Sequence, residues 1–412
     1  MLRGMRVLDL STERGLLCGQ MLGDLGADVI KIEPVGGSPV RQLPPWLDER
    51  PGADNSIYWL AFNRNKRAIT LNLESAAGRG LLKQLVAKAD ILIESEEPGR
   101  MAAAGLDYAA LSAANPALVY VAITPFGQDG PKAGWADSDL ILMAAAGVLI
   151  LYGDEDRAPI RMSVPQAYHH AAADAAGAAL IAYYERLASG RGQLVDVAAQ
   201  ESIGLAGQST ALAALVESAE TQRMAGGAKL GGLRVPLVWS CKDGLVSCVF
   251  LFGSAIGVFT RRLVDYIFAQ GACDETMKNT DWIGYGAKLM SGEEPLANYE
   301  QAKAVIAEFL QGRSKAELFE IARANNLLIA PIATIEDLRE NPQFAARQFW
   351  QTVAHPDGRR LTYPGAFARF SATPMSIRRR PPTVGEHNRE ILGGELGLSD
   401  AELAALAQQG VI

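Results

Sequence analysis

Short apolar runs alternate with segments of helical periodicity along the first third of the chain. Five runs have the length and composition of buried strands: Met5–Leu10, Val29–Glu33, Ala68–Leu73, Ile91–Glu94 and Leu118–Thr124. Three segments between them have helical spacing: Leu16–Leu25, Ala76–Ala89 and Met101–Ala114. Strand, helix and strand follow one another within roughly thirty residues, which predicts βαβ units and a parallel sheet. The expected fold class is therefore α/β, with a doubly wound domain.

A stretch rich in small residues, Arg161–Ala198, lies at the centre of this pattern. Its middle is an alanine-rich helix with little side-chain bulk, so another backbone can lie close to it. Ser189–Gly192 ends this helix, and Gln193–Val197 alternates like a short strand. The turn before the helix presents Tyr168, His169 and His170 but no carboxylate, and we expect any chemistry to take place there.

The pattern changes near residue 220. Gln200–Glu217 is predicted to be one helix, and paired glycines follow it. Leu237–Phe252 is predicted to form a hairpin around an Asp-Gly turn, and Phe259–Asn325 is helical and richer in charge. An apolar strand resumes at Leu328–Ile332. We therefore predict a large domain with parts at 1–220 and 326–412, and a smaller domain at 221–325.

Composition and charge limit the partners and the cellular location that we expect for the chain. The chain has 412 residues and a formal net charge of −7, which disfavours nucleic acid and anionic membrane surfaces as partners. Its longest apolar run, Leu140–Leu151, is shorter than the ~20 residues that cross a bilayer. The start has no signal-peptide core, and the four cysteines are scattered, so we expect reduced thiols and a cytoplasmic location.

Common catalytic motifs are missing from the sequence. His169 and His170 are neighbours on a helix and do not converge, so no metal site is expected. There is no GxSxG elbow and no GxGxxG fingerprint. Asp174 is the one carboxylate of the central helix, and its spacing directs it away from Tyr168. Three acids, Glu94, Glu96 and Glu97, are expected in a solvated loop that disfavours phosphate groups.

Eight segments occur in an order that resembles the family III CoA-transferases, a family that includes formyl-CoA transferase, carnitine CoA-transferase and α-methylacyl-CoA racemase. They are MRVLDLS, LGDLGADVIKIEP, NRNKRAITLNL, Ile91–Gly99, GLDYAALSAANPALVYVAIT, FGQDGP, SGRGQLVDVA and VGEHNREIL. The resemblance covers essentially the whole chain. It implies a Rossmann-like large domain from both chain ends, a small middle domain, and a ring-shaped chain in an interlocked dimer. It also implies a coenzyme A thioester as substrate and no permanently bound cofactor.

The family mechanism starts with an aspartate that attacks the acyl-CoA thioester, and that position falls here on Tyr168. A phenol cannot form the mixed anhydride that the mechanism requires. The resemblance assigns Lys66, Arg67, Leu71 and Ser95 to CoA binding, although Ser95-Glu96 and Ala103 depart from the family pattern. Gln166, Tyr168 and His169 would line a degenerate site. Ser138-Asp139 replaces the racemase histidine motif, so racemase activity is not supported.

The family contains heteromeric enzymes, such as the benzylsuccinate CoA-transferase of anaerobic toluene breakdown, in which only one of two paralogous subunits carries the aspartate. This chain resembles the subunit that lacks it, with a paralogous aspartate-bearing chain as partner. Two alternatives stay open. The chain could be a self-sufficient homodimeric CoA-transferase that uses Asp174 or another carboxylate, or a non-enzymatic protein that binds CoA esters.

Overall fold

The structure, a computed structural model, describes residues 1–216, 223–230 and 233–412. The chain forms two compact units. Unit 1 contains Met1–Ile150, Ile160–Thr221 and Ala346–Ile412, and unit 2 contains Leu151–Pro159 and Gln222–Ala345.

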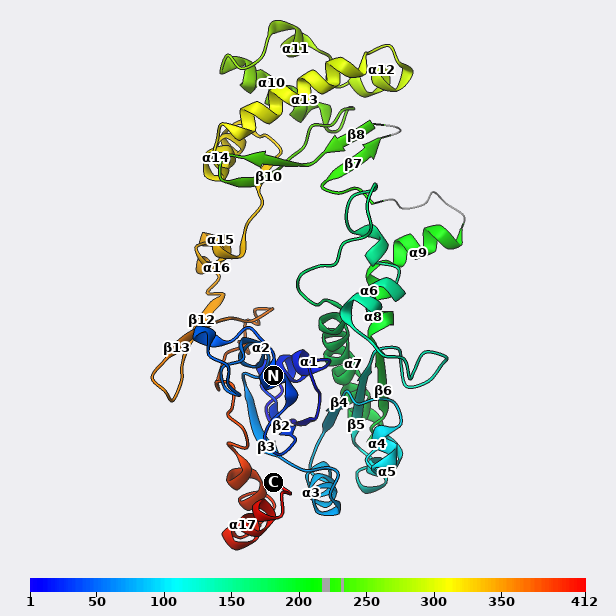
Figure 1. Ribbon diagram of the computed structural model, residues 1–412, viewed down its shortest axis with the longest axis vertical. Coiled ribbons are helices and arrows are strands. Elements are labelled where there is room, and N and C mark those ends of the chain that lie inside the picture. Colours follow the sequence, from blue (N-terminus) through cyan, green and yellow to red (C-terminus); the bar gives the residue numbers. More distant parts are fainter. Residues whose placement is uncertain (217–222, 231–232) are drawn as a thin grey trace. The chain divides into compact units, whose positions relative to one another are not determined.

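Unit 1 is built on a six-stranded parallel sheet with strand order β3-β2-β1-β4-β5-β6 (Figure 1). Its strands are β1 (Arg6–Asp9), β2 (Asp28–Glu33), β3 (Lys66–Thr70), β4 (Ile91–Glu94), β5 (Val119–Thr124) and β6 (Leu194–Ala198). The order reverses between β1 and β4, which creates a crevice at the carboxyl ends of these neighbouring strands. The predicted α/β fold with a central parallel sheet is confirmed. The interlocked dimer concerns two chains and stays a prediction.

The helices of unit 1 connect and cover these strands. They are α1 (Leu16–Asp24), α2 (Ile57–Phe62), α3 (Ala76–Val86), α4 (Arg100–Ala103), α5 (Tyr108–Ala114), α6 (Asp139–Ala145), α7 (Ala167–Ser189), α8 (Ala199–Ala206), α9 (Gln208–Leu215) and α17 (Asp400–Gln408). Short helical turns lie at Pro39–Gln42, Leu47–Glu49, Leu149–Leu151 and Arg389–Gly393, and a hairpin is formed by β12 (Trp350–Ala354) and β13 (Arg360–Pro364).

Two predicted helices were wrong in extent. The helix expected at Met101–Ala114 is divided into α4 and α5, because Gly105 adopts a φ of 63° and Asp107 then caps α5 by accepting a bond from Ala110 N. The helix expected at Gln200–Glu217 is divided into α8 and α9 at Gly207. Glu217 lies outside the described residues.

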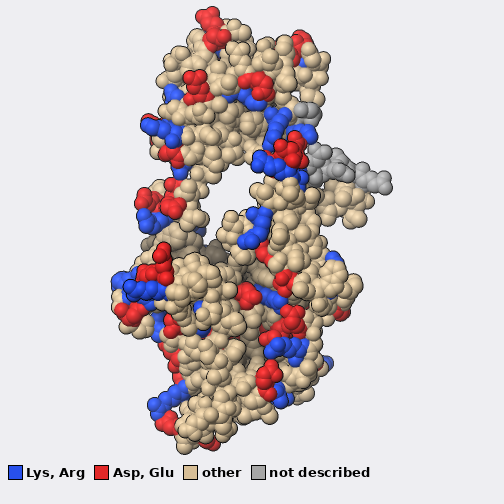
Figure 2. All heavy atoms as spheres, in the orientation of Figure 1, with Lys and Arg blue, Asp and Glu red and all other residues tan. Residues whose placement is uncertain are grey.

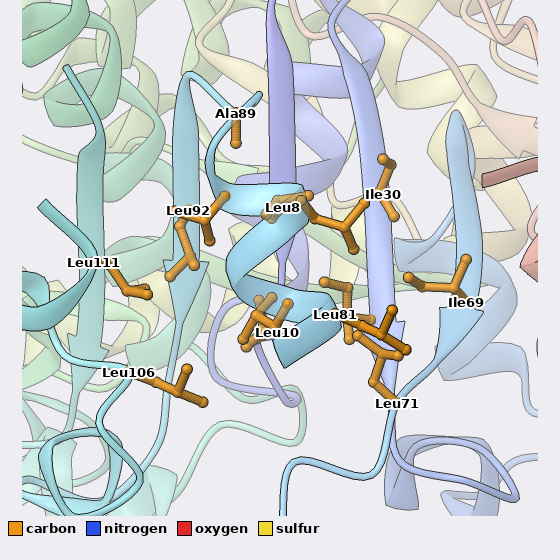
Figure 3. Packing of buried hydrophobic residues seen from close by; sticks show 14 of the residues in the cluster. Leu8, Leu10, Ile30, Ile69, Leu71, Leu81, Ala89, Leu92, Leu106 and Leu111 are labelled. Carbon is orange, nitrogen blue, oxygen red and sulfur yellow. The ribbon is translucent and has the colours of Figure 1, made fainter. Parts of the chain in front are cut away.

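One face of the sheet carries an extensive apolar core of unit 1 (Figure 3). Leu8 is in register with Ile30 on one side and with Leu92 on the other, so the three side chains form a row across the sheet. Leu81 of α3 points toward this row (Figure 3). The amphipathic pattern of α3 thus buries its leucines on the strands.

The opposite face is covered by α1, which packs against α7. The small residues of α7 make this packing possible, since Ala171 and Ala175 are completely buried. Gly19 of α1 lies against the carboxylate of Asp9, and a Cβ at this position would collide with it. The small-residue helix therefore forms a packed core layer, and only its first turn reaches the carboxyl edge of the sheet.

Unit 2 contains a three-stranded antiparallel sheet in the order β11-β10-β9 and a hairpin of β7 and β8. Its strands are β7 (Gly227–Leu230), β8 (Leu233–Pro236), β9 (Val238–Cys241), β10 (Gly244–Cys248) and β11 (Ile329–Pro331). Its helices are α10 (Gly257–Ala269), α11 (Glu275–Asn279), α12 (Tyr285–Ser291), α13 (Leu296–Gln311), α14 (Lys315–Asn325) and α15 (Ile335–Arg339), with α16 (Pro342–Ala346) at the boundary of the unit. Phe250 and Tyr299 stack at 5.5 Å in its core.

Candidate functional site

The carboxyl ends of β1, β4 and β5 meet at one edge of the sheet, where open α/β folds bind ligands. The loops that leave these strands are held together by hydrogen bonds. Thr12, after β1, donates from its backbone N–H to Ser95 Oγ after β4 at 2.8 Å. Arg14 Nη1 lies 3.4 Å from the Ser95 carbonyl oxygen. The first turn of α7 completes this edge.

Tyr168 lies in that first turn, and its hydroxyl donates a hydrogen bond to Asp137 Oδ2. The other oxygen of Asp137 accepts from Arg14 Nη2 at 2.6 Å. The Arg14 guanidinium lies 5.8 Å from the centre of the Tyr168 ring and also pairs with Glu97 at 2.8 Å. Burial and the bond to Asp137 raise the pKa of Tyr168 above its usual value of 10.0. Tyr168 is therefore a neutral hydrogen-bond donor and not an anionic nucleophile.

Asp137 is the carboxylate that the sequence reasoning missed. It precedes Tyr168 by 31 residues in the chain, on the loop after β5, and no motif connects the two positions. Asp174, the carboxylate that the sequence singled out, is exposed on α7. It lies six residues beyond Tyr168, which is about 9 Å along the helix axis at about 1.5 Å per residue. Asp137, and not Asp174, is the carboxylate in contact with Tyr168.

Asp139 stabilises the start of α7 from the neighbouring helix. Its Oδ1 accepts from the backbone N–H of Gln166 at 2.6 Å and of Ala167 at 2.8 Å. These N–H groups have no partner inside the helix, so a carboxylate at this end is favourable. The Gln166 side chain is used locally, because its Nε2 donates to the carbonyl oxygens of Val164 and Pro165.

The side chains of His169 and Tyr168 lie in different surroundings. Its Nδ1 lies 2.8 Å from the Pro165 carbonyl oxygen, and its ring stacks on Phe62 at 5.0 Å. Burial lowers the pKa of His169. The neutral ring therefore donates from Nδ1, which leaves Nε2 as a buried acceptor without a partner among the described residues. The predicted group of Gln166, Tyr168 and His169 shares one helical turn, but only Tyr168 contacts the Arg14–Asp137 pair.

Lys66 and Arg67, assigned to CoA binding by the resemblance, are adjacent on a strand and therefore point to opposite faces. Lys66 Nζ is fully buried and bonds to Asp9 Oδ2 at 2.8 Å. Burial would raise the pKa of Asp9, but the ammonium groups of Lys66 and Lys31 lower it to about 2. This is an internal ion cluster beneath α1.

Arg67 pairs with Asp28 at 2.6 Å and with Glu395 at 2.7 Å. Leu71 is buried in the core below α3, and Ser95 is 2 % exposed and bonded to Thr12. The polar groups among these assigned residues already have partners within the chain. Their role in CoA binding stays a prediction.

Glu94 differs from its expected place in a solvated loop. It is the last residue of β4, is 3 % exposed, and accepts a bond from Glu96 N at 2.6 Å. Burial raises its pKa to about 7. Glu96 and Glu97 follow it toward the surface, with side chains that are 32 % and 55 % exposed. The acids of this loop therefore differ in environment, and only the latter two face water.

The part of the chain that the structure describes offers little for metal or membrane binding. No group of three or more His, Cys, Asp or Glu residues there could hold a metal ion. No described helix combines the length and apolar character needed to cross a bilayer. Acidic and basic side chains are interspersed on the face shown in Figure 2.

Comparison with known proteins gives consistent similarities over almost the full length. The model of CoA-transferase family III matches residues 2–388. The chain is 36% identical to the BbsE subunit of succinyl-CoA:(R)-benzylsuccinate CoA-transferase from Thauera aromatica, over 99% of this chain and 97% of that protein. It is 31% identical to succinyl-CoA–D-citramalate CoA-transferase from Chloroflexus aurantiacus, over 99% and 97%. Among solved structures, a CAIB/BAIF family protein from Brucella suis has a TM-score of 0.80 and 28% identity, over 95% and 98% of the two chains.

Proposed function

Because this chain belongs to CoA-transferase family III, we propose that it is the subunit of a heteromeric CoA-transferase that lacks the nucleophile. One observation carries the proposal. The residue at the expected nucleophile position is Tyr168, a neutral phenol that donates to Asp137. A carboxylate that attacks a thioester displaces the CoA thiolate and gives a mixed anhydride, which the thiolate can attack to form an enzyme-bound CoA thioester, whereas a phenol gives an aryl ester. The central step of covalent transfer is therefore not available at Tyr168.

The partner in this proposal is a paralogous chain that carries the aspartate, in a heterodimer or heterotetramer with interlocked chains. The similarity to a protein named as a subunit, at 36% identity over almost the whole length, supports a multi-chain enzyme. We propose succinyl-CoA as donor and an organic acid such as benzylsuccinate as acceptor, following the names of the relatives. The reaction would take place in the cytoplasm, in keeping with four unpaired cysteines.

A self-sufficient enzyme is the second candidate, and Asp137 is the observation that favours it. This carboxylate from the same chain lies at the hydroxyl of Tyr168. However, both of its oxygens are engaged, one by Arg14 and one by Tyr168, and its side chain is only 10 % exposed. A carboxylate held in this way is a poor nucleophile, so the first candidate is the better supported. A CoA-ester-binding protein without transferase activity is the third.

The test compares the chain alone with the chain co-expressed with its aspartate-bearing paralogue. Purified samples receive succinyl-CoA and (R)-benzylsuccinate, and mass spectrometry measures benzylsuccinyl-CoA and hydroxylamine-trapped peptides. We expect no transfer by the chain alone, and transfer by the complex that persists in Tyr168→Phe but is lost when the paralogue's aspartate is changed to asparagine. Transfer by the chain alone that disappears in Asp137→Asn would establish the self-sufficient alternative.

A further inference from the structure

Asp137 is bound as an external carboxylate ligand would be. One oxygen receives a charge-assisted bond from the Arg14 guanidinium and the other receives the Tyr168 O–H. Arginine and a neutral hydroxyl are the donor types that protein sites use to hold carboxylates. Here the carboxylate belongs to the loop after β5 rather than to a substrate.

From this arrangement we propose that Arg14 and Tyr168 form a carboxylate-binding site that the chain's own Asp137 fills. Removal of the Asp137 carboxylate would open the site to an organic acid. The inference rests on the proposed function in one respect, since that function makes carboxylic acids the substrate class. It deepens that function by proposing that this chain's own edge of the sheet excludes the acid substrate, because Asp137 occupies the donors of Arg14 and Tyr168.

Part of the cluster is exposed to solvent. The side chains of Arg14 and Asp137 are 15 % and 10 % exposed, whereas Glu97, on the same guanidinium, is 55 % exposed. A dicarboxylate that enters past Glu97 could place one carboxylate on Arg14 and keep the other in water. Glu97 also neutralises Arg14 in part, so the affinity gained on removing Asp137 is expected to be moderate.

Charge explains why the site does not take an acid while Asp137 is present. Arg14 has two carboxylate partners, Asp137 and Glu97, and the exposed Glu13 also lies close enough to Tyr168 to raise its pKa. An additional anion would thus meet an excess of negative charge at short range. A single substitution at Asp137 removes the one carboxylate that occupies the donors.

The experiment measures succinate binding by calorimetry to the full chain and to its variants. Asp137→Ala is expected to bind succinate at least tenfold more tightly than the unmodified chain. The double variant Asp137→Ala with Arg14→Gln is expected to return to the unmodified level. Asp137→Ser also empties the space that the carboxylate occupies, so it should show a gain even if Asp137→Ala folds poorly. Asp129→Ala, on the same loop but exposed and with no side-chain hydrogen bond to the described residues, is the matched control and should bind like the unmodified chain.

Formate is the second probe, because it is a carboxylate small enough for the space that the Asp137 carboxylate leaves. Binding of formate by Asp137→Ala supports the carboxylate site even where the larger succinate does not fit, and if neither acid binds, the proposal fails. It also fails if neither Asp137 variant gains affinity, or if the gain survives Arg14→Gln. These assays contain no CoA and no partner chain, so their failure is distinct from a failure of the proposed transferase function.

Discussion

Replacing Glu94 by glutamine should change how the stability of unit 1 depends on pH. Glu94 ends β4 at the carboxyl edge of the sheet and is 3 % exposed. Burial raises its pKa from the usual 4.5 to about 7, and the nearby carboxylates of Glu96 and Asp196 act in the same direction. The bond from Glu96 N opposes this shift but does not cancel it. The folded protein therefore keeps a proton that the unfolded chain releases at lower pH.

The sign of the effect follows from this difference in proton binding. Between pH 4.5 and about pH 7 the unfolded chain has lost the proton and the folded chain has not, so stability falls as the pH rises. The whole contribution is present below pH 4.5 and is lost above about pH 7. A tenfold change in proton activity corresponds to about 1.4 kcal/mol, so the interval amounts to about 3 kcal/mol. Glutamine keeps the acceptor for Glu96 N and does not ionise, which removes this contribution.

Urea unfolding at about pH 5 and about pH 8 measures the contribution of Glu94 to the free energy of unfolding. Pulsed hydrogen exchange of the β4 and β5 peptides is the readout for unit 1. We subtract the free energy of unfolding of the unmodified chain from that of Glu94→Gln. This difference should be about 3 kcal/mol larger at the higher pH than at the lower pH. Glu13→Gln makes the same change at an exposed carboxylate of a neighbouring loop and controls for the substitution itself. If the Glu94→Gln and unmodified chains have parallel pH dependence, the buried, protonated Glu94 described above is refuted.

Three further substitutions test the contacts around the carboxyl edge. Gly19→Ala should cost at least ~2 kcal/mol, measured by urea unfolding, because the new Cβ would collide with the Asp9 carboxylate. Asp139→Ala should cost about 2 kcal/mol and speed hydrogen exchange in the first turn of α7, since two N–H groups lose a charged acceptor. Tyr168→Phe should cost about 1–3 kcal/mol in thermal unfolding, as it leaves one oxygen of Asp137 without its donor; an unchanged midpoint would contradict the described bond.

The strands of unit 1 could be predicted because buried parallel strands consist of continuous apolar residues. Ile91–Glu94 agrees with β4 residue for residue. Helix ends were harder to predict, because they depend on single backbone conformations. Gly105 could have continued a helix, and only its positive φ, followed by the Asp107 cap, separates α4 from α5. Local periodicity does not contain that information.

The basic pair Lys66-Arg67 shows a second limit of sequence reasoning. A resemblance assigns both residues to one ligand, but a strand sends neighbouring side chains to opposite faces. The Lys66 ammonium pairs with buried Asp9, and the Arg67 guanidinium pairs with Asp28. These pairings give both residues a structural role, since a buried charge is stable only with a partner. Their presence in the sequence therefore says little about CoA.

Tyr168 could be placed from the sequence, but the consequences of having it there could not. The hydroxyl of the half-buried Tyr168 needs an acceptor, and Asp137 supplies one. A buried carboxylate in turn needs a cation, and Arg14 supplies it. Removing Asp137 would take the acceptor from Tyr168, and removing Arg14 or Tyr168 would leave one oxygen of Asp137 without its donor. The three side chains at this edge of the sheet therefore depend on one another. It follows that Tyr168→Asp alone should not restore a nucleophile, because the new carboxylate would face Asp137, and like charges at contact distance favour protonation of one of them.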